Sequence, residues 1–207
     1  MPPSFALGVV ILAAGRSTRM GRPKLLLPWG DTSVIGHLIS EWRALEVGQV
    51  AVVRAADDAV LQLELDRLGF SLADRILNPT PERGMFSSVQ CAARWSAWKA
   101  GLTHWAIVLG DQPQISRDTL RTILAFSAAH PEQICVPKQG GHRRHPLLLP
   151  RTEFLQLAGS TAPDLKSVMD HHIEKIGFCE LDDAALELDI DRPEDYERAV
   201  AMFLRKR

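Results

Sequence analysis

Residues 9–24 of this chain read Val9-Val10-Ile11-Leu12-Ala13-Ala14-Gly15-Arg16-Ser17-Thr18-Arg19-Met20-Gly21-Arg22-Pro23-Lys24. The stretch begins with an apolar run, continues with small residues at 13–15 and ends in a segment rich in arginine. Such a run predicts a buried strand that leads into a loop at the carboxyl edge of a sheet. The small residues keep the loop backbone free of bulk, so a ligand can lie directly on its amides. The cationic residues of the loop are Arg16, Arg19, Arg22 and Lys24.

Clustered positive charge beside an open backbone is what a polyphosphate requires, so the loop indicates a nucleoside triphosphate site. The loop is not the Walker phosphate loop, which needs Gly-x-x-x-x-Gly-Lys-[Ser/Thr]. It also lacks the Gly-x-Gly-x-x-Gly pattern of dinucleotide-binding proteins, which argues against an oxidoreductase of that type. The alternative is an ordinary turn between a strand and a helix, with solvated basic side chains.

Length and composition agree with a compact enzyme. With 207 residues the chain is long enough to bury a substantial core, and we expect a single domain over 1–207. The formal net charge of -1 predicts no general attraction to nucleic acid or to an anionic membrane, and no apolar run is long enough to span a bilayer. The three cysteines are far apart and odd in number, which supports neither a disulfide framework nor a zinc site. The expected location is therefore cytoplasmic.

Segments with the patterns of strands and helices alternate along the chain. The predicted strands are 9–12, 50–53, 104–109, 134–137 and 146–149, the last two around a turn at 140–141. The predicted helices are 34–45 with a cap at Thr32 or Ser33, 57–68, 87–98, one that begins after Ser116, and 193–204. This alternation predicts a three-layer α/β/α fold of Rossmann-like type, with a mostly parallel sheet and a small antiparallel hairpin.

An acidic residue follows the predicted strand at 104–109. Asp111 lies in the segment Leu109-Gly110-Asp111-Gln112-Pro113. Ligands of open α/β sheets bind beyond the carboxyl ends of the strands, and Mg²⁺ takes one or two carboxylates together with phosphate oxygens. Asp111 is therefore a candidate Mg²⁺ ligand. The alternative is a Gly-Asp turn in which Asp111 caps a neighbouring group.

A second acidic segment, Leu188-Asp189-Ile190-Asp191-Arg192-Pro193-Glu194, precedes the last predicted helix. On a strand, Asp189 and Asp191 would face the same side, because they are two residues apart. We favour Asp191 as the second metal ligand, with Asp189 as the alternative. Glu194 follows Asp191 at the spacing of a capping box, so a purely structural cap competes with the metal role.

Two further segments carry polar side chains suited to a small anionic ligand. Residues 78–89 combine a glycine with adjacent serines where a helix is expected to begin. Residues 138–146 form a turn whose tip holds His142, Arg143, Arg144 and His145. Zinc is not expected at these histidines, because no cysteine or carboxylate lies nearby in the sequence. The basic tip predicts a site for an anionic acceptor, with a solvated basic turn as the alternative.

These four motifs, in this order, resemble those of the MobA-like nucleotidyltransferases. Leu-Ala-Ala-Gly-x-Ser-x-Arg-Met-Gly-x-x-Lys at 12–24 is most similar to the branch that includes molybdenum cofactor cytidylyltransferases. The resemblance implies the nucleotide-diphospho-sugar transferase fold, catalytic roles for Arg19, Lys24 and Asp111, and metal binding by Asp111 with Asp191 or Asp189. It implies nucleotide contacts by Leu12, Ala13, Ala14, Gly15, Arg16, Asn78, Gly84, Ser87 and Ser88. It implies acceptor contacts by His142, Arg143, Arg144 and His145.

The reaction that the resemblance implies is a Mg²⁺-dependent transfer of a nucleoside monophosphate from a nucleoside triphosphate to a phosphorylated acceptor, with release of pyrophosphate. The Ala-Ala-Gly segment favours CTP over GTP, and the branch implies molybdopterin as acceptor and a molybdoenzyme as partner. The alternatives are a guanylyltransferase, a sugar-phosphate nucleotidyltransferase, and a non-catalytic nucleotide-binding maturation partner of a molybdoenzyme. The chain departs from the family pattern at Phe86 and Ala92, which bears on selection of the base, and also at Arg144 and Arg192.

Overall fold

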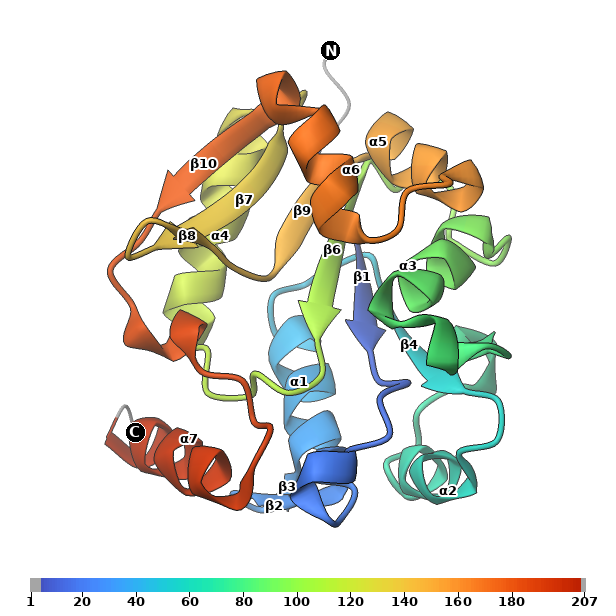
Figure 1. The fold of residues 1–207 in the computed structure, drawn as a ribbon, viewed down its shortest axis with the longest axis vertical. Coiled ribbons are helices and arrows are strands. Elements are labelled where there is room, and N and C mark those ends of the chain that lie inside the picture. Colours follow the sequence, from blue (N-terminus) through green and yellow to red (C-terminus); the bar gives the residue numbers. More distant parts are fainter. Residues whose placement is uncertain (1–4, 206–207) are drawn as a thin grey trace.

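One continuous sheet passes through the molecule, and its spatial order differs from the order of the strands in the chain. In the computed structural model, which describes residues 5–205, the order is β10-β7-β9-β6-β1-β4-β5, with the short β8 paired to β7 (Figure 1). The strands are β1 (Leu7–Leu12), β4 (Gln49–Ala55), β5 (Arg75–Asn78), β6 (His104–Leu109), β7 (Ile134–Gln139), β8 (His142–Arg143), β9 (Leu147–Pro150) and β10 (Ile176–Glu180). A separate ribbon pairs β2 (Pro28–Trp29) with β3 (Thr32–Ser33).

Most neighbouring strands run parallel. β1 is parallel to both β4 and β6, β5 is parallel to β4, and β10 is parallel to β7. β9 is antiparallel to β6 and β7, and β8 is antiparallel to β7. The prediction of a mostly parallel sheet with a small antiparallel part is therefore confirmed.

The hairpin around the turn at 140–141 contains a break in its second arm. Lys138 faces Arg143 in β8, whereas Cys135 faces Leu148 in β9, so the register shifts by two residues between the two short strands. Extra residues in one strand interrupt its hydrogen bonding to the neighbouring strand and change the direction of their own side chains. The break lies at 144–146. The Arg144 amide still donates to the Pro137 carbonyl of β7 at 2.8 Å, whereas His145 belongs to neither short strand.

Helices cover both faces of the sheet (Figure 1). One apolar cluster includes side chains from α1 (Val34–Arg43), α2 (Ala59–Arg67), α4 (Arg117–Ala129) and α7 (Pro193–Arg205); the other includes side chains from α3 (Met85–Arg94), α5 (Arg151–Gln156) and α6 (Leu165–His171). In β1, Val9 and Ile11 belong to the first cluster and Val10 and Leu12 to the second, because successive side chains point to opposite faces. The predicted three layers are thus confirmed, and β1 is buried on both faces.

Most predicted elements lie close to the observed ones. The strand predicted over 104–109 has those bounds, and Ser33 rather than Thr32 caps α1 by accepting a hydrogen bond from the Gly36 amide. Ser116 caps α4 through the Thr119 amide. The helix predicted over 87–98 ends at Arg94 instead. The sequence analysis did not identify β5, β10, α5 or α6.

The carboxyl ends of β1, β4 and β6 meet at one edge of the sheet. Backbone hydrogen bonds join the loops there, since the Ala13 amide donates to the Val53 carbonyl at 2.8 Å and the Gly110 amide to the Leu12 carbonyl at 3.1 Å. A Cβ at Gly110 would lie 2.6 Å from that Leu12 oxygen, so the close approach requires glycine. Within residues 5–205, every helix is too short or too polar to cross a membrane.

Candidate active site

The loop after β1 folds back over the edge of the sheet. It contains the 3₁₀ turn Thr18–Met20, and Ser17 before this turn has a left-handed φ of 50°. The Ser17 hydroxyl accepts a hydrogen bond from the Lys24 amide at 3.2 Å, which closes the loop. Buried Leu25 anchors the loop in the core. This conformation brings the side chains of Arg19 and Lys24 to the carboxyl end of β6.

Two of the predicted cations contact two of the predicted carboxylates. The Lys24 ammonium donates to Asp111 Oδ2 at 2.6 Å and to Asp191 Oδ1 at 3.2 Å. Arg19 Nη1 donates to the other Asp191 oxygen, Oδ2, at 2.6 Å. The fold thus assembles these four side chains from three segments that are far apart in the chain.

The surroundings of Lys24 keep its ammonium charged. Burial lowers the pKa of Lys24, but the charge of Asp111 and the hydrogen bonds to Asp111 and Asp191 outweigh it, so the net pKa is raised. Asp111 Oδ1 is buried and has no hydrogen-bond partner among the described residues. No group of three or more His, Cys, Asp or Glu side chains in residues 5–205 is arranged to hold a metal ion. A Mg²⁺ that shares phosphate oxygens needs only one or two carboxylates, so Asp111 and Asp191 fit that ion.

Asp189 has a different environment from Asp191. Its Oδ1 accepts a hydrogen bond from Gln112 at 2.8 Å, and burial, followed by the charge of Asp111, raises its pKa. The start of α7 is capped by Asp195, whose Oδ2 accepts hydrogen bonds from the amides of Asp191 and Arg192 at 3.3 and 2.9 Å. The alternative weighed from the sequence, a capping box of Asp191 with Glu194, is therefore not formed. Because Asp195 takes that role, the Asp191 carboxylate is available to Arg19 and Lys24.

A pocket of about 320 Å³ lies beside this charge cluster. Its floor is the backbone after β1, and its far wall is the start of α3. The predicted nucleotide-contact residues that line it are Leu12, Ala13, Ala14, Gly15, Gly84 and Ser88, and Lys24 and Asp111 also line it. Arg16 lies outside this lining, with its guanidinium 3.6 Å from exposed Asp57. Ala13 and Ala14 are buried and Gly15 is exposed, and the Ala13 amide already donates to the Val53 carbonyl.

Asn78 and Ser87 do not line the pocket but support its wall. Asn78 is fully buried, and its amide nitrogen donates to the hydroxyls of Ser87 and Ser88 at 2.8 and 2.9 Å. Its carbonyl oxygen accepts from the Thr80 amide at 2.9 Å. Ser87 donates in turn to the Gly84 carbonyl at 2.7 Å. The side-chain nitrogen and oxygen of Asn78 are both engaged within the protein, so the geometry assigns it to positioning the start of α3.

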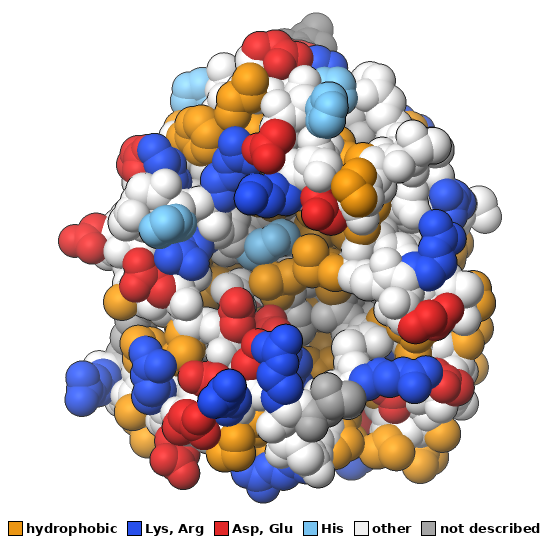
Figure 2. Space-filling model, in the orientation of Figure 1, with side chains coloured by type: hydrophobic (Ala, Val, Ile, Leu, Met, Phe, Trp, Pro, Cys, Tyr) orange, Lys and Arg blue, Asp and Glu red, His pale blue; other side chains and the backbone are white. Residues whose placement is uncertain are grey.

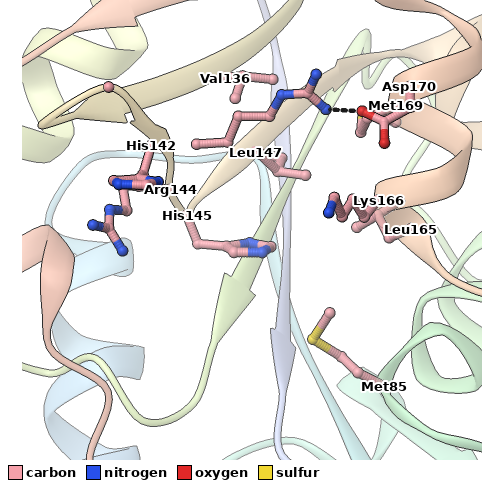
Figure 3. A pocket seen from close by; sticks show the side chains of 12 residues that line it. Met85, Val136, His142, Arg144, His145, Leu147, Leu165, Lys166, Met169 and Asp170 are labelled. Atoms are coloured by element: carbon pink, nitrogen blue, oxygen red, sulfur yellow. Dashed lines mark hydrogen bonds and ion pairs between the residues drawn. The ribbon is translucent and has the colours of Figure 1, made fainter.

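A second, larger pocket of about 750 Å³ adjoins the first, and Met85 lines both (Figure 3). All four residues predicted to bind the acceptor line it, namely His142, Arg143, Arg144 and His145. Figure 2 shows that this face of the molecule is hollowed over the region where β1 and β6 end in Figure 1, with charged side chains around the hollow.

His145 lies at the inner end of this pocket. Its Nδ1 is 3.3 Å from the Ile107 carbonyl of β6, so the ring is oriented by the backbone. Burial lowers the pKa of His145, against the opposing effects of that hydrogen bond and of the Asp111 charge. His145 is therefore a neutral ring close enough to Asp111 to interact with it, whereas the sequence grouped it with the cationic residues of the hairpin.

The two arginines of the hairpin have separate acidic partners. Arg143 Nη1 donates to Asp170 of α6 at 2.6 Å, and Arg144 Nη2 lies 3.5 Å from Glu187 Oε1. The Nε of Arg144 is buried without a hydrogen-bond partner among the described residues. An unpartnered guanidinium donor beside a pocket favours an anionic ligand.

Several side chains of the two pockets carry no signal in the sequence. Lys166 and Asp170 come from α6, which no hydrophobic pattern had identified, and Met85 precedes the helix start that we predicted. Gln112 follows Asp111 directly in the sequence, but no sequence pattern indicates that its side-chain amide donates a hydrogen bond to Asp189. These residues lie at the site because the tertiary fold brings distant segments together, and local sequence patterns do not encode that arrangement.

Comparison with known proteins places these observations in a family. The molybdenum cofactor cytidylyltransferase of Escherichia coli (strain K12) is 23% identical over 195 residues, which are 92% of this chain and 94% of that protein. The bifunctional protein GlmU of Leifsonia xyli subsp. xyli is 34% identical over 129 residues, or 59% of this chain, and the match spans only 25% of that relative.

A solved structure shares the whole fold. The crystal structure of Rv0371C from Mycobacterium tuberculosis H37Rv in complex with manganese is 28% identical, has a TM-score of 0.69, and covers 95% of this chain and 98% of its own. The model of the MobA-like NTP transferase domain matches residues 9–176, which is most of the chain. The chain therefore belongs to the MobA-like NTP transferase domain family.

Proposed function

We propose that this protein transfers a nucleoside monophosphate from a nucleoside triphosphate to a phosphorylated acceptor and releases pyrophosphate. The observation that carries the proposal is the position of the Lys24 ammonium, which contacts both Asp111 and Asp191 at the wall of the smaller pocket. The larger pocket next to it offers a separate site for the acceptor. Family membership supports an enzyme of the nucleotidyltransferase class.

The chemistry follows from charge and position. An oxygen of the acceptor phosphate forms a bond to the α-phosphorus, the bond from that phosphorus to the bridging oxygen breaks, and the electron pair leaves with pyrophosphate. Phosphate monoesters are largely ionised near neutral pH, so no side chain has to remove a proton. Catalysis then rests on orientation and charge neutralisation. When a triphosphate enters, Lys24 and Arg19 exchange their carboxylate partners for β- and γ-phosphate oxygens.

Asp111 and Asp191 are the residues that would hold a divalent cation, which we propose to be Mg²⁺. The unpartnered Asp111 Oδ1 supports this role, and the manganese complex of the mycobacterial relative supports a divalent ion in the family. When bound, such an ion neutralises charge on the phosphates. Asp189 is the weaker candidate, because its carboxylate is already engaged by Gln112.

We further propose CTP as the preferred nucleotide and molybdopterin as the acceptor. Ala13 and Ala14 line the smaller pocket, and their methyl groups narrow the space beside a base, which favours a pyrimidine. The relative from Escherichia coli supports a cytidylyl transfer to the molybdenum cofactor, and its match extends over almost the whole chain. The match to GlmU keeps a sugar-phosphate acceptor as the second candidate.

Thermal unfolding with each nucleotide tests the proposal. We expect CTP to raise the melting temperature more than GTP, UTP or ATP, and to do so only with Mg²⁺, because a ligand that binds the folded state stabilises it. A pyrophosphate-release assay with phosphorylated acceptors then identifies the acceptor. The absence of a shift with every nucleotide, in the presence of Mg²⁺, would contradict a triphosphate site.

The substitution Lys24→Ala tests the central observation. We expect turnover to decrease by about 100-fold or more, because a positioned cation that faces developing charge is lost. Arg121→Ala is the matched control, since Arg121 is an exposed cation on α4 that pairs only with Asp118 among the described residues. Circular dichroism would establish that both variants remain folded. Near-normal turnover in Lys24→Ala would refute this role.

A further inference from the structure

The larger pocket has an inner end that borders the reaction centre. Met85 lines both pockets, and His145 is close enough to Asp111 for the two to interact electrostatically. If the proposed function holds, the reacting phosphate of the acceptor lies at this inner end, since it must reach the α-phosphate of the nucleotide. The rest of the acceptor then extends away from Asp111 toward α6.

The opposite, outer end carries its own basic group. Arg143 comes from the hairpin and is held by Asp170 of α6 at 2.6 Å. Lys166, from the same helix, extends into the pocket (Figure 3). Lys166 interacts electrostatically with Asp164, but within residues 5–205 no carboxylate forms an ion pair with it. Arg143, Lys166 and Asp170 line the pocket, whereas Asp164 does not. The lining side chains of this end therefore carry one net positive charge.

Apolar side chains make up much of the remaining lining. They are Val136, Leu147, Leu165 and Met169, which belong to the core of this face of the sheet. A volume of about 750 Å³ is within the range for pockets that bury a ligand of drug size. The pocket thus combines a polar inner end, apolar lining and a cationic outer end. A small, uniformly polar phosphate ester would leave the apolar lining and the outer end without complementary groups.

We propose that Lys166 and Arg143 form an outer anion subsite, and that the acceptor is a phosphate ester with a second anionic group at the far end of an apolar body. Lys166 is the specificity residue, because its ammonium is not neutralised by an ion pair. Asp170 is a positioning residue that holds Arg143 at the rim. This assignment rests on the proposed function, since it takes the inner end as the place of the reacting phosphate.

Matched pairs of ligands test the subsite without knowledge of the natural acceptor. The probes are phenyl phosphate and 4-carboxyphenyl phosphate, and a longer pair, biphenyl phosphate and 4′-carboxybiphenyl phosphate. Binding of each is measured by calorimetry on the full chain with Mg²⁺ and a non-hydrolysable CTP analogue. Each pair differs only in the distal carboxylate, so the ratio of the two dissociation constants reports on that group alone.

We expect the carboxylate to tighten binding by about fivefold or more in at least one pair, as a charge-assisted hydrogen bond does. The ratio is expected to approach one in Lys166→Gln and to decrease in Arg143→Gln. Lys99→Gln is the control and keeps the ratio, because Lys99 is exposed and bonds to the Gly48 carbonyl away from both pockets.

Two outcomes would contradict the outer subsite. In the first, the distal carboxylate does not improve binding to the unmodified protein in either pair of ligands. In the second, the improvement persists in Lys166→Gln. Thermal shift by CTP with Mg²⁺, recorded for every variant, separates this failure from failure of the proposed function. A retained nucleotide shift with no carboxylate preference refutes only the outer subsite, whereas loss of the shift in the unmodified protein refutes the nucleotide site itself.

Discussion

Asp189 and Asp191 are separated by one residue, yet their carboxylates have different partners. Asp191 contacts Arg19 and Lys24, whereas Asp189 accepts from the side-chain amide of Gln112. The difference arises because the segment is not a strand. The Asp191 amide bonds back to the Asp189 carbonyl at 3.1 Å, and the Ile190 amide bonds to the Asp111 carbonyl at 3.0 Å. The sequence alone left the two residues as alternatives, and this local turn favours Asp191.

The two substitutions Asp191→Asn and Asp189→Asn should therefore differ in metal binding. With CTP present, we expect Asp191→Asn to weaken binding of Mn²⁺ by about tenfold or more, because a charged ligand is lost, and Asp189→Asn to weaken it much less. Electron paramagnetic resonance of free Mn²⁺ measures both constants. An equal loss in the two variants, or a larger loss in Asp189→Asn, would contradict the assignment.

At the scale of elements, the junction between β5 and α3 depends on a single buried amide. Asn78 ends β5 and holds the first turn of α3 through the hydroxyls of Ser87 and Ser88. This turn forms a wall of the smaller pocket, which connects the packing of an edge strand to the shape of the candidate site. The sequence predicted that Asn78 touches the nucleotide, and we now propose a positioning role for it.

The substitution Asn78→Ala is expected to lower the free energy of unfolding by about 2–4 kcal/mol, because it removes three hydrogen bonds and leaves buried partners unsatisfied. Urea unfolding measures the change. Ser116→Ala, which removes the cap of α4 and the contact of Ser116 with the Thr119 hydroxyl, is the reference and should cost about 1 kcal/mol. A cost for Asn78→Ala no larger than that of the reference would refute the positioning role.

At the scale of the whole molecule, the sheet keeps His104 apart from the candidate active site. His104 begins β6, is 4% exposed and lies at the opposite end of that strand from Asp111. Its Nε2 is 2.8 Å from the Pro131 carbonyl and its Nδ1 is 2.9 Å from the Thr103 hydroxyl. Burial lowers the pKa of His104, against the raising effects of the Pro131 hydrogen bond and the charge of Glu132.

A histidine whose pKa is lower in the folded protein binds fewer protons there than in the unfolded chain. The free energy of unfolding should therefore decrease as the pH falls below about 6.5, and this loss levels off below the folded pKa. In His104→Gln we expect the free energy of unfolding to depend less steeply on pH. The slope should decrease by at most about 1.4 kcal/mol per pH unit, the contribution of one proton. Urea unfolding between about pH 7.5 and pH 5 compares the slopes. Identical slopes in the two proteins would show that His104 does not contribute.

The sequence predicted the strand at 104–109, the buried strand at 9–12 and most of the helices that cover the sheet, because these segments have strong apolar patterns. It missed α6 and β10, since the region 160–180 alternates polar and apolar residues without a sustained pattern. A single domain over 1–207 and a cytoplasmic location remain predictions. Four of the twelve residues that line the larger pocket were predicted for it, because the hairpin tip is rich in basic residues whereas Lys166 and Asp170 have no local signature.

The sequence by itself determined the family, the βα alternation, the open loop after β1 and the residue types that can neutralise a triphosphate. These properties depend on local composition and on spacing along the chain. Only the tertiary structure decided which charges meet: Lys24 contacts carboxylates 87 and 167 positions away. It also decided that Asp195 rather than Glu194 caps α7, and that Lys166 faces the hairpin. The physical reason is that the loops after parallel strands all lie at the same edge of the sheet. Which loops are neighbours there depends on the order of the strands in the sheet and not on local sequence.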